Sequence, residues 1–227
     1  MSGGHDLILL DLDGTISDPL VGIGRSINHA LAHFGHRTFE LHELARYIGP
    51  PLDETFASIT GSASQTEIAA LVAKYRERYG DVGYAENVLY PGVADALAAL
   101  RRAGLPLGLC TSKRGDFADR ILEMFGLREH FEFVSGGEIG IPKWRQIESL
   151  LRSGQVSEAS VMVGDRAIDV DAAHRNGLHA AGVLWGYGSA AELAQARPRY
   201  SFASPAELRE LVSGPATMPP IASGEPP

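Results

Sequence analysis

The feature that most constrains the fold is a short apolar run followed at once by two acidic residues. Leu7-Ile8-Leu9-Leu10 contains no polar residue, which is typical of a strand that is covered on both faces of a sheet. The run continues into Asp11-Leu12-Asp13-Gly14-Thr15. Side chains two apart on an extended segment point the same way, so Asp11 and Asp13 should project together beyond the strand. A metal ion with an anionic substrate would explain this pair, and so would two solvated aspartates at a capped strand end.

The residues after this motif form one long helical block. Helix-face spacing of apolar residues predicts helices at 21–35, 41–47, 52–59 and 64–79. We expect residues 15–20 to be a connector and find no strand-like run within 21–80. The block is therefore an all-helical insertion that directly follows the first strand.

The second half of the chain alternates helices with strands. Helices are predicted at 93–103, 116–125, 143–152, 167–176 and 205–212, and strands at 105–110, 131–134, 161–163, 179–184 and 200–202. Strands that alternate with helices indicate a parallel sheet with helices on both faces. The sequence therefore predicts an α/β fold, a doubly wound parallel sheet that carries a small all-α insertion.

Composition excludes several classes of protein. Hydrophobic residues make up 44% and charged residues 21%, as in ordinary globular domains. The net charge of −8 argues against general binding to nucleic acid or to anionic membranes. No apolar run is long enough to span a bilayer, and the N-terminus lacks a secretion signal. The single cysteine, Cys110, ends an apolar run, so we expect a buried thiol in a protein of the cytoplasm.

Chemically active side chains follow the predicted strands. In an open parallel sheet, ligands bind beyond the carboxyl ends of the strands, and there hydroxyls and cations suit phosphoryl oxygens while acids suit a metal. The residues expected at this edge are Asp11 and Asp13 after the first strand, Thr111, Ser112 and Lys113 after the second, Lys143 at a helix start, and Asp165 with Asp169 after the strand at 161–163.

These motifs, in this order, resemble those of the haloacid dehalogenase-like hydrolase superfamily. Its four motifs are matched by Asp11–Thr15, by Thr111 or Ser112, by Lys143, and by Gly164–Asp169. The segments Gly49–Leu52, Tyr90–Val93 and Trp185–Ser189 are similar to those of the phosphoglycolate phosphatase-like subgroup. The resemblance implies a Rossmann-like core at 1–16 and 89–213 and a C1-type helical cap at 17–88. The content of Pro, Gly and Ser predicts a flexible tail at 214–227.

The resemblance also implies a role for each residue. Asp11 would be the nucleophile that forms an aspartyl-phosphate, and Asp13 would protonate the leaving alcohol and then activate water. Mg²⁺ would be bound by Asp11, the main-chain carbonyl of Asp13 and Asp165, with Asp169 in support. The groups expected to bind the phosphoryl oxygens are Thr111, Ser112, Lys113 and Lys143, of which Thr111 and Lys143 also count as catalytic.

The predicted function is Mg²⁺-dependent hydrolysis of a small phosphorylated metabolite, as in phosphoglycolate phosphatases. The acid at Asp13 favours this over dehalogenases of the same scaffold, whose halide leaves without a proton. The alternatives are a 5′-nucleotidase acting on nucleoside monophosphates, a sugar-phosphate mutase, and a phosphate-binding protein without catalysis.

Two departures from the family pattern leave details open. Pro142 precedes Lys143, whereas many relatives have a proline after this lysine, so either Lys113 or Lys143 can be the main phosphate contact. Arg166 directly follows Asp165, which leaves the share of Asp169 in metal binding undecided.

Overall fold

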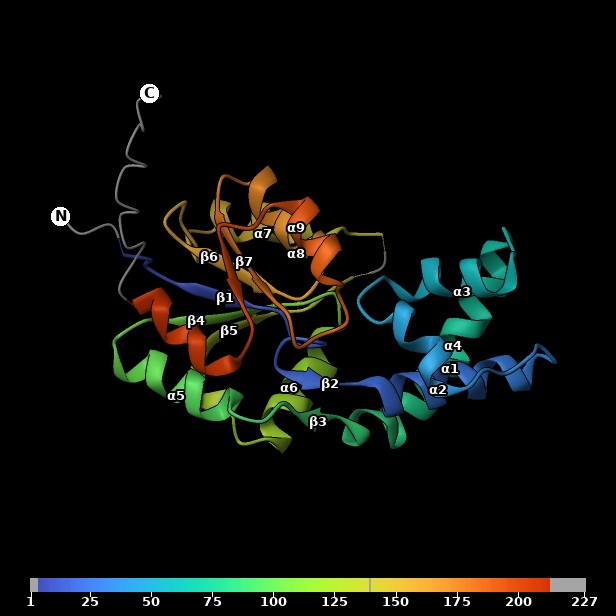
Figure 1. Ribbon diagram of the computed structural model, residues 1–227. Helices are drawn as coiled ribbons and strands as arrows, with labels where there is room; N and C mark the ends of the chain where they lie inside the picture. The colour runs from blue at the N-terminus through green and yellow to red at the C-terminus, as the bar shows by residue number, and fades with distance from the viewer. Residues whose placement is uncertain (1–3, 139, 213–227) are drawn as a thin grey trace, which may run out of the picture.

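A six-stranded parallel sheet forms the centre of the computed structural model, which describes residues 4–138 and 140–212 (Figure 1). The strand order is β5-β4-β1-β6-β7-β8, and all neighbours are parallel. The strands are β1 (Ile8–Leu10), β4 (Leu107–Cys110), β5 (Phe131–Ser135), β6 (Val161–Gly164), β7 (His179–Val183) and β8 (Tyr200–Phe202). The predicted doubly wound α/β sheet is confirmed, including its edge strand at 200–202.

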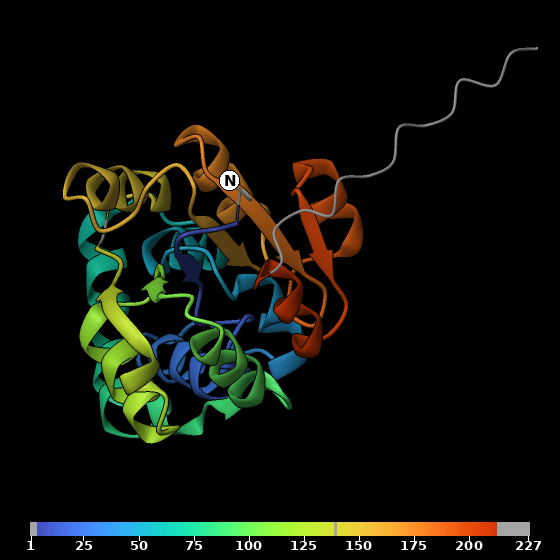
Figure 2. The same ribbon diagram turned by 90° about the vertical axis from the view of Figure 1, so that its left-hand side faces the viewer.

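Helices cover both faces of the sheet. One face carries α5 (Val93–Arg102), α6 (Gly115–Met124) and the 3₁₀ helix η4 (Pro205–Val212), and the other carries α7 (Lys143–Arg152), α8 (Ala167–Arg175) and α9 (Ala190–Ala196). In Figure 2 the gold α7 lies above the strands and the green α5 below them. Ile8 and Leu10 belong to the first core, and Leu7 and Leu9 to the second. Burial on both sides explains why the first strand is apolar throughout.

The helical block has a hydrophobic core of its own. It consists of α1 (Leu20–His33), α2 (Leu41–Leu44), η1 (Ala45–Tyr47), α3 (Leu52–Thr60), α4 (Gln65–Asp81) and η2 (Gly83–Glu86). Its buried residues include Ile27 of α1, Phe56 of α3 and Leu71 of α4, and Phe117 of α6 joins them from the sheet domain. In Figure 1 the block lies at the right, beside the carboxyl ends of β1 and β4. The cap boundaries at 17–88 remain a prediction, and the tail at 214–227 lies outside the described residues.

The expectation of a plain connector at residues 15–20 is wrong. Ser17–Asp18 forms β2, which pairs antiparallel with β3 (Val88–Leu89), so the two crossings between sheet and helical block are hydrogen-bonded to each other. A strand of two residues is too short to show an alternating pattern, and its partner lies about seventy residues away.

The structure also contains two short helices that the sequence did not predict. Residues 190–196 form α9, which was not predicted from the sequence, and η3 (Arg128–His130) precedes β5. Ser189 caps α9 by accepting a hydrogen bond from the Glu192 backbone, so the Ser-Ala-Ala-Glu sequence was the available signal. In the described part of the chain, no helix is both long and apolar enough to cross a membrane.

Candidate active site

The register of the sheet brings the predicted site residues to one edge. Leu10 of β1 is level with Leu109 of β4 and with Val163 of β6. The backbone N–H of Asp11 donates to the Val163 carbonyl at 2.9 Å, so the acidic motif begins where β6 ends. Because the three strands run in parallel, the residues that follow them meet beyond the same end of the sheet.

Three carboxylates gather at this edge. Oxygens of Asp11, Asp165 and Asp169 lie within 4.8 Å of one another, and all three residues are buried. Burial, followed by the charges of Asp169 and Asp11, raises the pKa of Asp165 to about 8. Asp165 Oδ2 accepts a hydrogen bond from the Tyr187 backbone at 2.7 Å, whereas Oδ1 is buried and has no partner among the described residues. An acidic cluster with an unpaired oxygen fits a hard divalent cation such as Mg²⁺.

Glycines allow the surrounding backbone to close on Asp165. Gly14 has a φ of 82°, and a Cβ there would lie 2.2 Å from Asp165 Oδ2. A Cβ at Gly186 would lie 2.4 Å from the Asp165 Cβ, and one at Gly188 would lie 1.8 Å from the Asp165 carbonyl oxygen. Side chains at these three positions would displace Asp165, so the glycines are needed for the cluster to form.

The loop that supplies two of these glycines packs on the first motif. The Trp185 indole N–H donates to the Thr15 carbonyl at 3.0 Å, and the Tyr187 hydroxyl donates to Asp18 Oδ1. Trp185 and Tyr187 thus hold this loop against the first motif. Asp18 and Tyr187 had no recognisable signal in the sequence, because their pairing depends on the tertiary fold.

The two lysines contact different aspartates. Lys143 Nζ lies 3.0 Å from Asp11 Oδ2 and also forms an ion pair with Asp169. Lys113 Nζ lies 2.9 Å from Asp13 Oδ2. Burial alone would lower the pKa of Lys143, but Asp11 and Asp169 outweigh it and raise that pKa. Lys143 therefore belongs to the acidic cluster and Lys113 to the second aspartate of the first motif.

Asp13 lies apart from the acidic cluster in its hydrogen bonding. Burial raises the pKa of its carboxyl group, and Lys113 opposes this rise. Oδ2 contacts Lys113, while Oδ1 is buried and lacks a hydrogen-bond partner within residues 4–138 and 140–212. The Asp13 side chain thus contacts Lys113 and keeps one oxygen unpaired among the described residues.

The predicted hydroxyl groups lie beside the lysines. Thr111 is buried, and its Oγ1 accepts a hydrogen bond from the Lys113 backbone at 3.2 Å, which leaves the hydroxyl proton to donate elsewhere. Ser112 lines the cavity next to Lys113. Cys110 at the end of β4 is buried as expected, and burial raises the pKa of its thiol to about 12.

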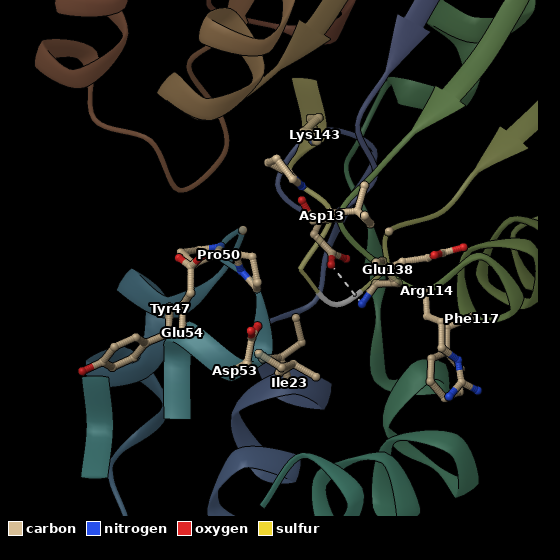
Figure 3. A pocket seen from close by; sticks show the side chains of 18 of the residues that line it. Asp13, Ile23, Tyr47, Pro50, Asp53, Glu54, Arg114, Phe117, Glu138 and Lys143 are labelled. Atoms are coloured by element: carbon tan, nitrogen blue, oxygen red, sulfur yellow. Dashed lines mark ion pairs between the residues drawn. The ribbon is translucent and has the colours of Figure 1, made fainter. Parts of the chain in front are cut away.

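A cavity of about 380 Å³ lies between the helical block and the sheet (Figure 3). Its inner wall includes Asp13, Lys113 and Lys143, and its outer wall includes Tyr47, Pro50 and Asp53. In Figure 3 the Asp53 carboxylate points up from the helical block toward Asp13. Asp53 Oδ1 is buried and has no hydrogen-bond partner among the described residues.

Arg166, which departs from the family pattern, links the sheet domain to the helical block. Its Nη1 donates to the Ile48 carbonyl at 2.5 Å, and its Nε donates to Glu192 at 2.9 Å. The Arg166 backbone N–H donates to Asp169 Oδ2 at 3.1 Å. With Lys143 at its other oxygen, Asp169 has partners for both oxygens, which suits a supporting role at a metal.

Comparisons with known proteins place the chain in a family. Residues 8–183 match the family described as Haloacid dehalogenase-like hydrolase. Tyrosine-protein kinase PtkA of Mycobacterium tuberculosis is 39% identical over 81% of this chain, which spans only 64% of the length of that relative. A 5′-nucleotidase of Pseudomonas aeruginosa is 38% identical to this chain, and the alignment covers 90% of this chain and 94% of that relative.

Further relatives support the subgroup and the fold. A phosphoglycolate phosphatase of Chromobacterium violaceum is 31% identical over 82% of this chain and 88% of its own length. The crystal structure of a predicted phosphatase from Clostridium acetobutylicum superposes with a TM-score of 0.85 at 32% identity, covering 91% of this chain and 97% of its own. The predicted superfamily and its phosphoglycolate phosphatase-like subgroup are thereby confirmed, and the chain belongs to the haloacid dehalogenase-like hydrolase family.

Proposed function

We propose that this chain is a Mg²⁺-dependent phosphomonoesterase of a small phosphorylated metabolite in the cytoplasm. The observation that carries the proposal is the separation of the two aspartates of the first motif. Asp11 lies with Lys143 in the acidic cluster, whereas Asp13 lies against Lys113 with one oxygen left without a partner in the described chain. One carboxylate is thus suited to attack phosphorus and the other to transfer a proton.

The acidic cluster provides the ligands for the cation. Asp11, Asp165 and the main-chain carbonyl of Asp13 would bind Mg²⁺, with Asp169 in support. Bound there, Mg²⁺ would neutralise charge on the nucleophile and on the phosphoryl oxygens.

Asp11 and Asp13 perform the bond-forming and proton-transfer steps of the proposed reaction. The Leu12 backbone N–H donates to Asp11 Oδ1 at 2.8 Å and orients the nucleophile. The Asp11 carboxylate forms a bond to phosphorus, the bond from phosphorus to the ester oxygen breaks, and Asp13 gives its proton to the departing alcohol. Asp13 then takes a proton from water, which attacks the aspartyl-phosphate and releases inorganic phosphate together with free Asp11.

The fixed groups beside Asp11 stabilise the transferred phosphoryl group. Thr111, Ser112 and Lys143 lie at the same sheet edge, where hydroxyl and ammonium donors can bind its oxygens. Arrangement of such donors before the reaction is the main source of rate in phosphoryl transfer.

Replacement of the nucleophile tests the proposal. Asp11→Asn should remove Mg²⁺-dependent hydrolysis of p-nitrophenyl phosphate, because an amide cannot form the aspartyl-phosphate. Asp171→Asn is the matched control, since Asp171 is an exposed residue of α8. Undiminished phosphate release by Asp11→Asn, with an unchanged circular dichroism spectrum, would overturn the mechanism. A sugar-phosphate mutase would instead take a phosphoryl group from a bisphosphorylated sugar and return it to a sugar monophosphate, which yields the isomeric monophosphate without net phosphate release.

The cavity favours one of the two candidate substrate classes. The carboxylate of phosphoglycolate would lie near Asp53 and Glu54, two acids that line the outer wall. A nucleoside monophosphate instead carries hydroxyl and amino donors for Asp53 Oδ1 and a flat base for the wall formed by Tyr47 and Pro50. The 5′-nucleotidase relative supports this second class.

A substrate comparison separates the two classes. We expect a higher kcat/KM for nucleoside 5′-monophosphates than for phosphoglycolate, and Asp53→Asn should reduce this preference by roughly tenfold. Arg76, a cation that also lines the cavity, is the candidate partner of a substrate carboxylate. A higher kcat/KM for phosphoglycolate, together with its loss in Arg76→Met, would favour the phosphoglycolate phosphatase instead.

A further inference from the structure

A series of buried hydrogen bonds joins Asp13 to the strand pair at the base of the helical block. Lys113 Nζ, which contacts Asp13, also donates to the Tyr79 hydroxyl at 2.7 Å. The Asn87 side-chain amide donates to the same hydroxyl at 3.2 Å, and Ser17 Oγ donates to Asn87 Oδ1 at 3.2 Å. Ser17 lies on β2, and Asn87 directly precedes β3. The series therefore runs from the catalytic carboxylate to both crossings of the chain.

Aromatic packing holds the Tyr79 ring in place. Tyr79 is only 1% exposed, and it stacks on Tyr75 with ring centroids 5.3 Å apart and planes 12° apart. Phe117 of α6 meets it edge-on at 5.1 Å, and Lys113 Nζ lies 4.5 Å from the Tyr79 ring centroid. The hydroxyl position is thus set by the packing of α4 against the sheet domain.

Lys113 depends on such a fixed partner. A lysine side chain has four flexible carbons and three donors, so a single ion pair leaves its ammonium group free to rotate away. With Asp13 Oδ2 on one side and the Tyr79 hydroxyl on the other, the ammonium group is held between two fixed acceptors. Asp13 Oδ2 is thereby occupied, and Oδ1 is the oxygen left without a partner in the described chain.

We propose that Tyr79 is a positioning residue for proton transfer: it holds Lys113 against one oxygen of Asp13, so that the other oxygen faces the leaving alcohol. This inference rests on the proposed phosphomonoesterase reaction. Tyr79 belongs to the helical block and Asp13 to the sheet domain. The acid is therefore correctly placed only while α4 is packed against the sheet domain, which links the position of the block to protonation of the product.

The dependence of rate on the leaving group tests this role. An alkyl phosphate such as glycerol 2-phosphate needs a proton on its departing oxygen, whereas p-nitrophenolate leaves as the anion. Tyr79→Phe keeps the packed ring and removes only the hydroxyl. It should lower kcat/KM roughly 10- to 100-fold for glycerol 2-phosphate and less than about 3-fold for p-nitrophenyl phosphate, because a positioned acid contributes about 10²–10⁴. The ratio kcat/KM is the right quantity, because it reports the steps up to and including departure of the alcohol. Hydrolysis of the aspartyl-phosphate comes later and does not affect it.

A neighbouring tyrosine provides the matched control. Tyr75→Phe makes the same change one turn earlier on α4, in a ring that stacks on Tyr79. It should change kcat/KM for both esters by the same factor, because no hydrogen bond within the described residues joins its hydroxyl to Lys113. An equal loss on both esters in Tyr79→Phe would overturn the inference, since that is the result expected of a merely structural role.

A double-mutant cycle gives a second, independent measurement. Lys113→Met should show the same selective loss on the alkyl ester, and Tyr79→Phe should add almost nothing in its presence. Fully additive losses would show that Tyr79 does not act through Lys113. Wild-type protein that hydrolyses neither ester would overturn the proposed function and this inference with it. Wild-type activity with an unchanged leaving-group ratio in Tyr79→Phe would overturn this inference alone.

Discussion

Asp165→Asn should stabilise the protein when no metal is bound and abolish its response to Mg²⁺. Asp165 is 1% exposed and lies beside Asp11 and Asp169, so the folded chain without a cation holds three acids against the single ammonium group of Lys143. Asparagine has nearly the same shape and can keep the hydrogen bond from the Tyr187 backbone, while it carries no charge. The variant therefore removes the repulsion without opening a cavity.

The size of the expected stabilisation follows from the pKa of Asp165, which rises from 3.8 to about 8 in the folded chain. At pH 7 the unfolded chain is ionised at this position and the folded chain is mostly protonated. About three pH units separate 3.8 from 7, and each corresponds to about 1.4 kcal/mol, so the acid destabilises the folded state by up to about 4 kcal/mol. For a chain of this size, 1 kcal/mol shifts Tm by about 2–4 °C, so Asp165→Asn should melt several degrees higher in EDTA.

The sign of the pH dependence follows from the same raised pKa. Between pH 4 and pH 8 the folded state binds more protons than the unfolded state, so the metal-free wild type loses stability as pH rises through this window. Asp165→Asn lacks this contribution, and its melting temperature should fall less between pH 5 and pH 8. Differential scanning fluorimetry across this range, with EDTA present, measures both slopes.

Addition of Mg²⁺ should reduce the difference in stability between the variant and the wild type. A cation present at 100 times its dissociation constant stabilises the folded wild type by about 2.7 kcal/mol, and the variant should show little of this gain. Asp171→Asn on the exposed side of α8 serves as the control and should change stability by no more than about 0.5 kcal/mol. A metal-free Asp165→Asn that melts below the wild type, or an equal Mg²⁺ response in both, would refute this account of the acidic cluster.

Three further substitutions test separate parts of the site. Gly14→Ala places a Cβ 2.2 Å from Asp165 Oδ2 at a backbone φ of 82°, which would displace the Asp165 carboxylate. The Mg²⁺-induced rise in Tm should therefore disappear, and a normal rise would contradict the close approach of Gly14 to Asp165. Lys143→Met leaves two buried carboxylates without their cation, so urea denaturation in EDTA should show a free energy of unfolding lower by about 3–5 kcal/mol. A decrease in this free energy of less than about 1 kcal/mol would argue against a buried ion pair. Arg166→Met removes a hydrogen bond to the helical block, so steady-state kinetics should show a KM raised several-fold with kcat nearly unchanged; a fall in kcat alone would place Arg166 in the chemical step.

The sheet and the acidic cluster could be predicted because their signals are local. Strands buried on both faces are continuous apolar runs, and parallel strands place the residues that follow them at one edge. Leu7–Leu10 and Val161–Val163 have this pattern, so the pattern alone predicts that Asp11 and Asp165 meet at the same edge of the sheet.

The contacts of the lysines and of Tyr79 could not be predicted in the same way. Lys113 and Lys143 differ in their partners only because α7 and the loop after β4 approach different aspartates, which is a property of the tertiary fold. Tyr79 lies at an apolar position of its helix, and the spacing predicts packing without indicating that the hydroxyl has a polar partner. The pair β2–β3 gave no signal because two residues cannot show a period.

The antiparallel pairing of Ser17–Asp18 with Val88–Leu89 has a consequence for the modularity of the chain. Because the chain leaves and re-enters the sheet domain side by side, residues 19–87 form an excursion whose two ends are already in contact. A short turn could join β2 to β3 and close the sheet domain without altering the register of the other strands. The helical block could therefore be exchanged or remodelled while the parallel sheet and the acidic cluster at its edge keep their arrangement.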